Sequence, residues 1–222
     1  MEFYHDYSVL GLSVPQRGGI YGPNQRAKAP IITAYLLFAL GKLKVRGASP
    51  IRVCELFCAD AYYSFIASRF GADSCDAFDN DRDGHTAEAR HIRDLLGDQR
   101  VNIQNQDVLD IPDNYRASIV INTGGLYHVT NPLTVLERSY CMATNYLIVQ
   151  SVVTLATERA DYFETPAPGW TWGCRFTHEF LIQAIRDRGY KIIDFERNIL
   201  TGNTRAEDRG SSYFLIECQG NA

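Results

Sequence analysis

The sequence lacks long hydrophobic runs and any excess of positive charge. No window of its 222 residues approaches the ~18 consecutive apolar residues that a membrane span requires. The first residues, from Met1 to Asp6, also lack the basic and then apolar order of a signal peptide. With 22 Lys and Arg against 26 Asp and Glu, the net charge is −4, so the chain has no general attraction to nucleic acid or anionic lipid. We therefore expect a cytoplasmic protein without a membrane partner, in which only a local basic patch would bind nucleic acid.

Closely spaced cysteine pairs are missing as well. The six cysteines are scattered, and Cys54 and Cys58 do not form the C-x-x-C pair that is typical of zinc sites. Four of the six fall in predicted apolar strands or a helix, where a free thiol behaves as a small hydrophobic group. The sequence therefore predicts no metal site.

Glycine is absent from the most informative turn of the chain. The apolar strand at residues 51–56 runs into Phe57, Cys58 and Ala59 before a new helix, and the acids Glu55 and Asp60 lie at the two ends of the turn. Small side chains at the carboxyl edge of a parallel sheet let a ligand lie against the backbone. A dinucleotide needs glycines around its pyrophosphate, so this turn favours a nucleoside-type ligand without phosphates.

A second acid follows the next apolar run. Asp79 closes residues 74–79, roughly 20 residues after the turn, where a ribose would lie in a nucleoside-binding sheet. The spacing alone fits a dinucleotide as well as a single nucleoside. The missing glycines are what separate the two.

Strands and helices alternate along most of the chain. Apolar residues recur at three- and four-residue steps, which predicts amphipathic helices at residues 31–43, 63–70, 89–96, 133–140 and 177–188. Helices between successive strands give right-handed crossovers, so the sheet is expected to be mostly parallel. The last two strands are joined by a polar loop, so the last strand is expected to be antiparallel. The expected strands cover residues 51–56, 74–79, 101–104, 117–121, 146–153, 190–200 and 211–218.

Two segments lie outside this alternation within the single domain expected for residues 1–222. Residues 1–23 are rich in Gly and Pro, which predicts an irregular N-terminal arm. Residues 154–176 combine Pro166, Pro168 and two tryptophans. A loop of this length in a compact domain is usually functional or disordered, and the tryptophans argue against disorder.

Four pieces of the sequence occur in the order that is typical of one enzyme family. They are the acid-led turn at residues 55–61, the acid Asp79, the step Gln106, Asp107 and Val108, and the segment at residues 122–128. Over residues 24–218 the chain resembles class I S-adenosylmethionine-dependent methyltransferases. The resemblance implies a Rossmann-like α/β fold with a seven-stranded, mostly parallel sheet, an antiparallel last strand and helices on both faces. The turn departs from the family's glycine-rich pattern at Phe57, Ala59 and Ala61.

The resemblance also implies S-adenosylmethionine as cofactor and S-adenosylhomocysteine as product. Asp79 would accept hydrogen bonds from the ribose hydroxyls, Glu55 would orient the methionine end, and Asp107 would meet the adenine amino group. A helix N-cap for Asp79 and a solvated loop carboxylate for Asp107 are the alternatives. The expected cofactor-binding residues are Glu55, Phe57, Ala59, Asp60, Asp79, Asn80, Asp107, Val108, Asn122, Thr123 and Gly124.

The candidate catalytic residues follow the fourth strand. His128 is the candidate general base, because an imidazole with a pKa near ~6.5 accepts a proton at neutral pH, and Tyr127 would orient the acceptor. The alternative is that His128 caps the next helix. Trp170, Trp172 and Arg175 are expected to form a lid over a planar or hydrophobic acceptor; alternatively they cover a sheet edge or form a contact in a homodimer.

Residues 126–128 and 171–177 also resemble a subgroup that includes tRNA wobble-uridine carboxymethyltransferases and many small-molecule enzymes. In the carboxymethyl enzymes a Tyr, matched here by Tyr127, helps to hold the extra carboxylate of a carboxylated S-adenosylmethionine. The Lys and Arg that those enzymes also need have only Lys28 and Arg175 as candidates. Asn24, Gln25, Arg26 and Lys28, at the head of the first helix, would close the cofactor pocket from the other side; alternatively they form a solvated helix start.

These patterns lead to one expected function and two alternatives. We expect transfer of a methyl group to a small-molecule acceptor by in-line displacement, in which positioning supplies much of the acceleration. One alternative is a tRNA uridine-modifying transferase, which transfers a methyl or carboxymethyl group. The other is a non-catalytic nucleoside-binding module with the same fold.

Overall fold

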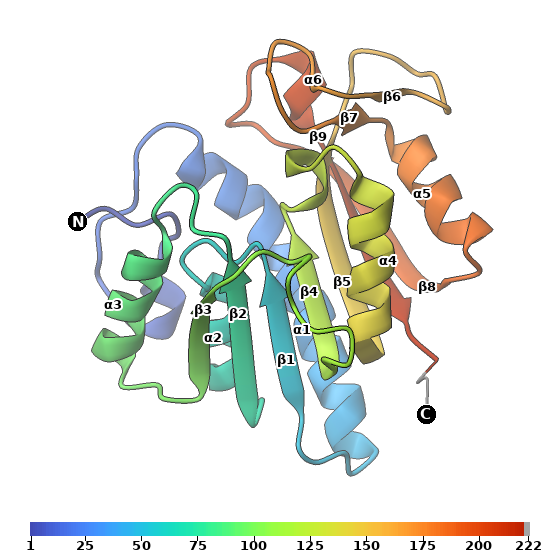
Figure 1. The fold of residues 1–222 in the computed structure, drawn as a ribbon. Helices are drawn as coiled ribbons and strands as arrows, with labels where there is room; N and C mark the ends of the chain where they lie inside the picture. The colour runs from blue at the N-terminus through green and yellow to red at the C-terminus, as the bar shows by residue number, and fades with distance from the viewer. Residues whose placement is uncertain (220–222) are drawn as a thin grey trace.

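The computed structural model describes residues 1–219 and contains a seven-stranded sheet in the order β3-β2-β1-β4-β5-β9-β8 (Figure 1). The five strands from β3 to β5 pair in parallel, whereas β9 pairs antiparallel with both β5 and β8. This arrangement confirms the predicted Rossmann-like sheet with its antiparallel last strand. The strands are β1 (Arg52–Leu56), β2 (Ser74–Asp79), β3 (Val101–Asn105), β4 (Ala117–Thr123), β5 (Ala143–Val153), β8 (Lys191–Ile199) and β9 (Gly210–Glu217).

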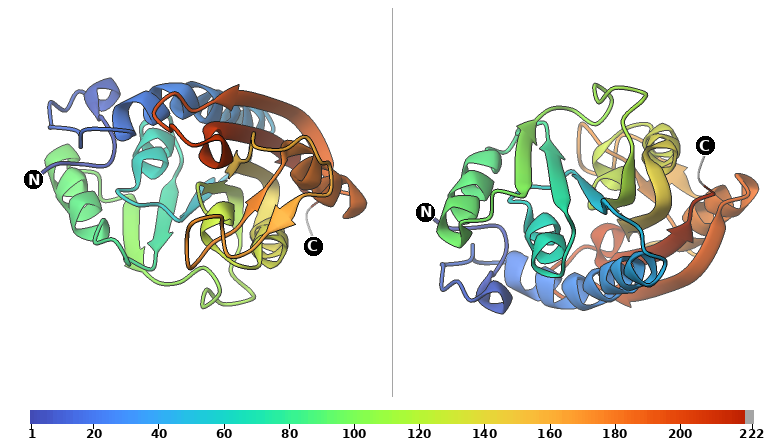
Figure 2. Two further views of the ribbon diagram at one scale, coloured as in Figure 1. Left: turned by 90° about the horizontal axis from the view of Figure 1, so that it is seen from above. Right: turned by 90° about the horizontal axis from the view of Figure 1, so that it is seen from below.

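Helices cover both faces of the sheet, as predicted (Figure 2). The long helix α1 (Tyr21–Val45), α2 (Tyr62–Arg69) and α3 (Thr86–Leu96) pack over one face, and α4 (Pro132–Met142) and α5 (His178–Asp187) pack over the other. Each face has its own buried core, because the inner strands alternate apolar side chains between the two faces. The central strands are therefore buried on both sides and fixed in register.

The N-terminal arm is irregular but packed against the domain. It contains one 3₁₀ turn, Ser8–Leu10, and its side chains Phe3 and Tyr7 are fully buried in the core beneath α1 and α2. The arm ends sooner than predicted, because α1 begins at Tyr21 and includes Gly22 and Pro23. Proline is tolerated in the first turn of a helix, where its missing N–H would have no partner.

The segment at residues 154–176 contains regular structure that the sequence pattern did not reveal. The short strands β6 (Phe163–Glu164) and β7 (Arg175–Phe176) form a two-stranded antiparallel sheet beside the upper end of β5 in Figure 1. The expected loop between β8 and β9 likewise contains a four-residue helix, α6 (Ala206–Arg209). Both pieces lie above the carboxyl ends of the central strands (Figure 1).

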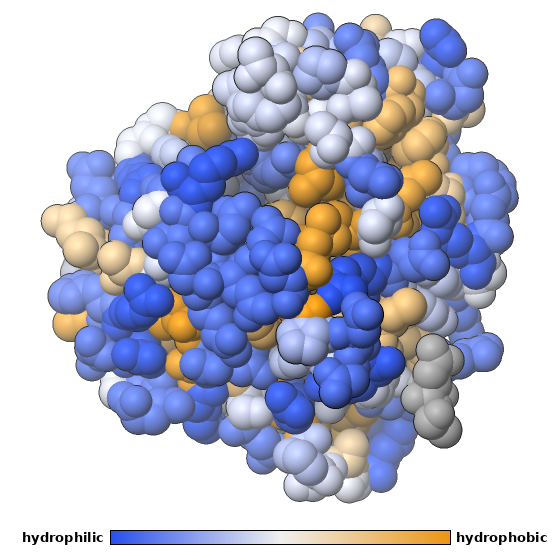
Figure 3. Space-filling model, in the orientation of Figure 1, coloured by the Kyte–Doolittle hydropathy of each residue, from blue (hydrophilic) through white to orange (hydrophobic). Residues whose placement is uncertain are grey.

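Polar residues cover most of the surface visible in Figure 3, and most apolar residues are buried in the two cores. The face shown in Figure 3 is mostly hydrophilic, and its hydrophobic residues gather near the centre of the view. Among residues 1–219, no helix combines the length and the apolar character that crossing a bilayer demands.

Candidate functional site

A cavity of about 760 Å³ opens at the carboxyl ends of the parallel strands. Its lining includes the last residues of β1, β2 and β4 and the segments that follow β2, β3 and β4. The strand order reverses between β1 and β4, so neighbouring crossovers lead away from each other and leave a crevice there. The volume lies in the range of roughly 300–1,000 Å³ that is typical of small-molecule sites.

The turn after β1 forms the floor of the cavity with an unusual backbone. Phe57, Ala59 and Ala61 have φ values of 55°, 47° and 62°, in the left-handed region that favours glycine. Phe57 packs over Gly125, where an added Cβ would lie only 2.0 Å from the ring. Phe57 stands where the family's turn commonly has a glycine, and its ring fills the space that Gly125 leaves by having no side chain.

Glu55 is buried at the end of β1 and holds the start of α2. Its carboxylate accepts hydrogen bonds from the backbone N–H of Ser64 at 2.7 Å and from the Ser64 hydroxyl at 2.6 Å. Burial raises the pKa of Glu55 to about 8, although the bonds from Ser64 act in the opposite direction. Glu55 lines the cavity, but its carboxylate is buried and its hydrogen bonds go to α2.

Asp79 lies at the end of β2 and lines the cavity beside the turn. Its Oδ2 accepts from the N–H of Ala59 at 3.0 Å and its Oδ1 from the N–H of Asp81 at 2.8 Å. Burial raises the pKa of Asp79, against the lowering effect of those two bonds. Each carboxylate oxygen offers about two acceptor positions, so the side chain keeps acceptor capacity toward the cavity.

The next two predicted residues form a pair at the same rim. Asn80 donates from Nδ2 to Oδ2 of Asp107 at 3.1 Å, and both line the cavity after β2 and β3. Thr123 and Gly124 line it at the end of β4, where the N–H of Gly124 donates to the carbonyl of Gln150 at 3.0 Å. The structure thus brings the residues predicted from three strands together around one space.

His128 and Tyr127 lie in the short 3₁₀ helix Leu126–His128 after β4, and both line the cavity. The His128 ring stacks on Trp172 at 5.2 Å between centroids, with the Arg82 guanidinium 4.7 Å from the centroid of Trp172. Burial lowers the pKa of His128 to about 4, helped by the positive charges of Arg82, Arg175 and Lys28. The imidazole is therefore neutral at pH 7, and within residues 1–219 its buried Nδ1 has no hydrogen-bond partner.

The two tryptophans roof the cavity, whereas Arg175 is held by the protein itself. Trp170 packs against Trp172 with centroids 5.1 Å apart, and both line the cavity. Arg175 donates from Nε to Asp208 at 2.7 Å and from Nη1 to the carbonyl of Cys174 at 2.6 Å. Arg175 as a whole residue is 4% exposed, and its bonds to Asp208 connect β7 to α6.

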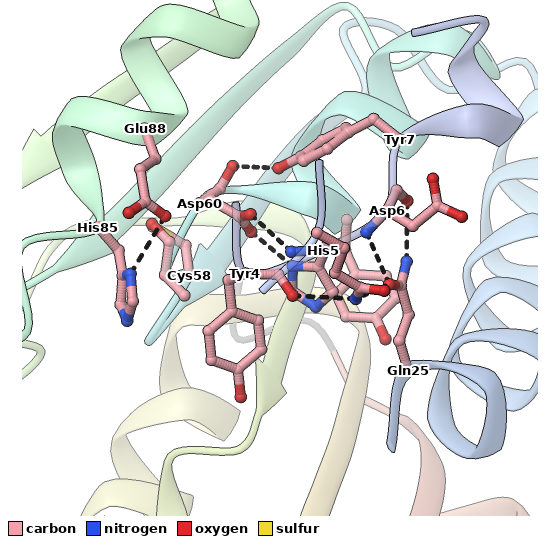
Figure 4. A network of polar contacts seen from close by, with 12 residues as sticks. Tyr4, His5, Asp6, Tyr7, Gln25, Cys58, Asp60, His85 and Glu88 are labelled. Carbon is pink, nitrogen blue, oxygen red and sulfur yellow. Dashed lines mark hydrogen bonds and ion pairs between the residues drawn. The ribbon is translucent and has the colours of Figure 1, made fainter. Parts of the chain in front are cut away.

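Three residues predicted to bind a cofactor do not line the cavity. Asp60 turns toward the N-terminal arm, where its carboxylate accepts from the His5 N–H at 2.8 Å and contacts Nδ1 of His5 at 2.5 Å (Figure 4). Val108 is buried in the core under α4, and Asn122 donates to the Ser139 hydroxyl at 2.9 Å. The left-handed turn redirects Asp60. Asn122 lies in β4, where neighbouring side chains point to opposite faces of the sheet, and Val108 begins a turn and packs its side chain into the core.

The cavity also contains residues that the sequence analysis did not assign. Tyr4 and Tyr21 enter it from the arm and the start of α1, and Gln150 enters from β5. Gln150 is fully buried in β5 directly after the apolar run at residues 146–149, and an amide at that point of the strand was the signal in the sequence that could have singled it out. The arm residues carried no such signal, since their position depends on tertiary packing.

Comparisons with known proteins identify the fold. No protein-family profile matches the chain, and no curated protein sequence matches it. Magnesium protoporphyrin IX methyltransferase from Synechocystis with bound SAH matches with a TM-score of 0.65 and 14% identity, covering 93% of this chain and 90% of that one. The SAH-bound N-terminal domain of EvdMO1 has a TM-score of 0.62 and 15% identity, with 96% and 85% covered. The [4+2]-cyclase SpnF has a TM-score of 0.60 and 16% identity, with 77% and 75% covered. The chain therefore has the Rossmann-like methyltransferase fold.

Proposed function

We propose that the protein transfers a methyl group from S-adenosylmethionine to a small-molecule acceptor. The observation that carries the proposal is the carboxylate of Asp79, which faces the cavity at the end of β2 beside the crevice between β1 and β4. Two of the compared structures contain SAH, the demethylated form of this cofactor. Because one compared protein is a cyclase, the fold alone does not decide the reaction, and the site must carry the argument.

The residues of the cavity fit this cofactor. Asp79 has free acceptor positions for two ribose hydroxyls, and the pair Asn80 and Asp107 offers polar contacts for the adenine edge. The backbone at Ala59 and Gly124 leaves room for the methionine part, since no bulky side chain branches from either position. A carboxylate that accepts from neutral hydroxyls contributes about 1.5–3 kcal/mol per bond.

The chain's own residues would mainly position the acceptor. When bound, the cofactor supplies an electrophilic methyl group on a sulfonium. His128 is neutral, and its Nδ1 can accept a hydrogen bond from an acceptor hydroxyl or amine. Its pKa of about 4 makes it a weak base at pH 7, so alignment contributes more than proton removal. The packed rings of Trp170 and Trp172 would exclude water above a planar acceptor.

The test measures SAH binding by isothermal titration calorimetry for the wild type, Asp79→Asn and Asp110→Asn. Asp79→Asn keeps the shape of the side chain and is expected to weaken SAH by ten-fold or more. Asp110 is an exposed carboxylate close to Asp107 and serves as the matched control with unchanged affinity. Turnover is then followed by mass spectrometry as SAH released from S-adenosylmethionine in the presence of an acceptor library.

The outcomes separate the functions. Wild-type protein that gives no heat with SAH and no thermal shift would contradict the proposal. Tight SAH binding that does not depend on Asp79 would contradict the assigned site. Binding without release of SAH from S-adenosylmethionine across the library would favour the non-catalytic module. Co-purification of a carboxylated cofactor, seen by mass spectrometry, would replace methyl transfer by carboxymethyl transfer.

A further inference from the structure

The part of the cavity on the far side of β4 from Asp79 has its own polar lining. There, α1 packs against β5, and the cavity wall is completed by the segment between β8 and β9. Lys28 from α1 and Gln150 from β5 line the cavity, and so do Trp170 and Trp172. Because the residues proposed to hold the cofactor lie at and after the ends of β1, β2, β3 and β4, the region toward β5 is the one that remains for an acceptor.

Lys28 is the cation of the cavity that lacks an internal partner. In the part of the chain that the structure describes, Lys28 Nζ makes no ion pair and no hydrogen bond, and burial lowers its pKa to about 8. The other basic side chains of the lining are paired: Arg17 with Glu88, Arg82 with Asp83, Arg175 with Asp208, and Arg205 with Glu207 and Asp208. Lys28 is partly buried, and a partly desolvated charge without a partner is costly, so a ligand that brings a negative charge would be favoured there.

Gln150 adds a hydrogen-bond acceptor that has no donor among the described residues. Its Nε2 donates to the Ser211 hydroxyl at 2.8 Å, which fixes the amide and directs Oε1 away from that bond. Gln150 is fully buried, and across residues 1–219 its Oε1 accepts no hydrogen bond. A buried acceptor left empty costs about 1–3 kcal/mol, so a ligand with a hydroxyl or amino donor would recover that cost.

We propose that the acceptor is a small organic acid whose oxyanion group binds Lys28 while a hydroxyl or amino group donates to Gln150. The inference rests on the proposed function, since it names the class of molecule that receives the methyl group. The positive surroundings of His128, to which Lys28, Arg82 and Arg175 contribute, favour the same kind of molecule. The aromatic roof favours a planar one.

The chain offers a direct optical test. Its only two tryptophans, Trp170 and Trp172, both line the cavity, so tryptophan fluorescence reports binding in this space. The probes are 4-hydroxybenzoate and its neutral match 4-hydroxybenzamide, together with 4-hydroxycinnamate and its amide, titrated at neutral pH with and without SAH. We expect the acids to bind at least ten-fold more tightly than the amides, which corresponds to about 1.4 kcal/mol.

Three variants assign the preference to Lys28. Lys28→Met and Lys28→Gln should remove the difference between acid and amide, and Lys42→Met, an exposed lysine on the same helix, should keep it. Equal binding of acid and amide by the wild type, including no binding of either, overturns the inference. A Lys28→Met variant that keeps the preference overturns it as well.

The same titrations separate an acceptor carboxylate from that of the cofactor. If Lys28→Met weakens SAH ten-fold and leaves the acid-to-amide ratio of the probes unchanged, Lys28 holds the methionine carboxylate and the inference is wrong. If the wild type fails to bind SAH but retains the acid preference, the proposed function fails while the anion site stands. SAH affinity and probe preference are separate readouts, so the two failures cannot be confused.

Discussion

At the residue scale, the contact between Asp60 and His5 explains how the N-terminal arm comes to line the cavity, which the pattern of strands does not predict. Asp60 is fully buried, and its carboxylate accepts from the backbone N–H and contacts the ring of His5 (Figure 4). Its backbone carbonyl accepts from the Tyr7 hydroxyl at 2.5 Å. These bonds fix the arm beside the turn, so that Tyr4 reaches the cavity.

From the buried contact between Asp60 and His5 we predict that the stabilising effect of the Asp60 carboxylate is lost at low pH. Burial raises the pKa of Asp60, but the charge and hydrogen bonds of His5 lower it more, so the folded pKa lies below its ordinary value near ~3.9. A depressed carboxylate pKa stabilises the fold fully above the unfolded value and less as the pH falls toward the folded one. We expect Asp60→Asn to lower the free energy of unfolding by about 3 kcal/mol at pH 7, and by progressively less below about pH 4.

Urea unfolding followed by circular dichroism across that pH range measures both effects. Asp6→Asn is the matched control in the same arm, because its carboxylate is exposed and bonds only within the turn to Ser8. Its effect should stay within about 1 kcal/mol. A difference between Asp60→Asn and the wild type that is independent of pH would contradict the lowered pKa of Asp60.

At the element scale, sequence patterns recovered the segments whose identity is set locally. The strands β1, β2 and β5 and the helices α3 and α5 have strong apolar periodicity, and they lie within a few residues of the predicted bounds. The pairing of β6 with β7 escaped prediction, because each strand has two residues and its hydrogen bonds depend on a partner more than ten residues away. Helix α6 is likewise too short to show a period.

The difference between local patterns and tertiary contacts also explains which site residues could be predicted from the sequence. Asp79, Asp107 and Thr123 were found because a strand end fixes where the next side chain goes. Asn122 and Val108 were assigned together with their neighbours, but Asn122 faces the opposite side of β4 from Thr123 and Val108 begins a turn, and both side chains are buried against the core. Lys28 was named as part of a helix start and as a candidate partner for a cofactor carboxylate, but its lack of an internal partner is a property of the folded cavity that the sequence does not show.

The roof segment at residues 154–176 predicts a measurable change at His128. Trp172 covers the imidazole and also holds the guanidinium of Arg82, and both burial and that charge lower the pKa of His128. Trp172→Ala should therefore raise the pKa of His128 from about 4 toward its ordinary value near ~6.5, by about one unit or more. The titration is followed by NMR of the histidine ring protons, with His128→Gln to assign the signal.

Trp170→Ala is the matched control for this element. The Trp170 ring contacts Trp172 and is 46% exposed, so its removal should change the pKa of His128 much less. An unchanged pKa in Trp172→Ala would mean that the segment does not shield the imidazole. Equal shifts in the two variants would mean that the roof acts as one unit and not through the stack on His128.

At the scale of the whole molecule, the balance of charge argues for a small acceptor and against tRNA. The net charge is −4, and of the five Lys and Arg side chains in the cavity lining, Arg17, Arg82, Arg175 and Arg205 are held in ion pairs, which leaves Lys28. Binding of a phosphate backbone depends on many unpaired Lys and Arg side chains that release counterions. The rim of this cavity offers no such surplus.

We therefore expect bulk tRNA to bind with a dissociation constant weaker than about 10 μM at physiological salt, both with and without SAH. The measurement is a filter-binding titration repeated at several salt concentrations. Because each phosphate contact steepens the dependence on salt, a single unpaired lysine such as Lys28 permits only a shallow slope. Submicromolar binding that falls steeply with salt would reveal a basic surface elsewhere on the molecule. In that case the wobble-uridine resemblance of residues 126–128 would become the better guide to the acceptor.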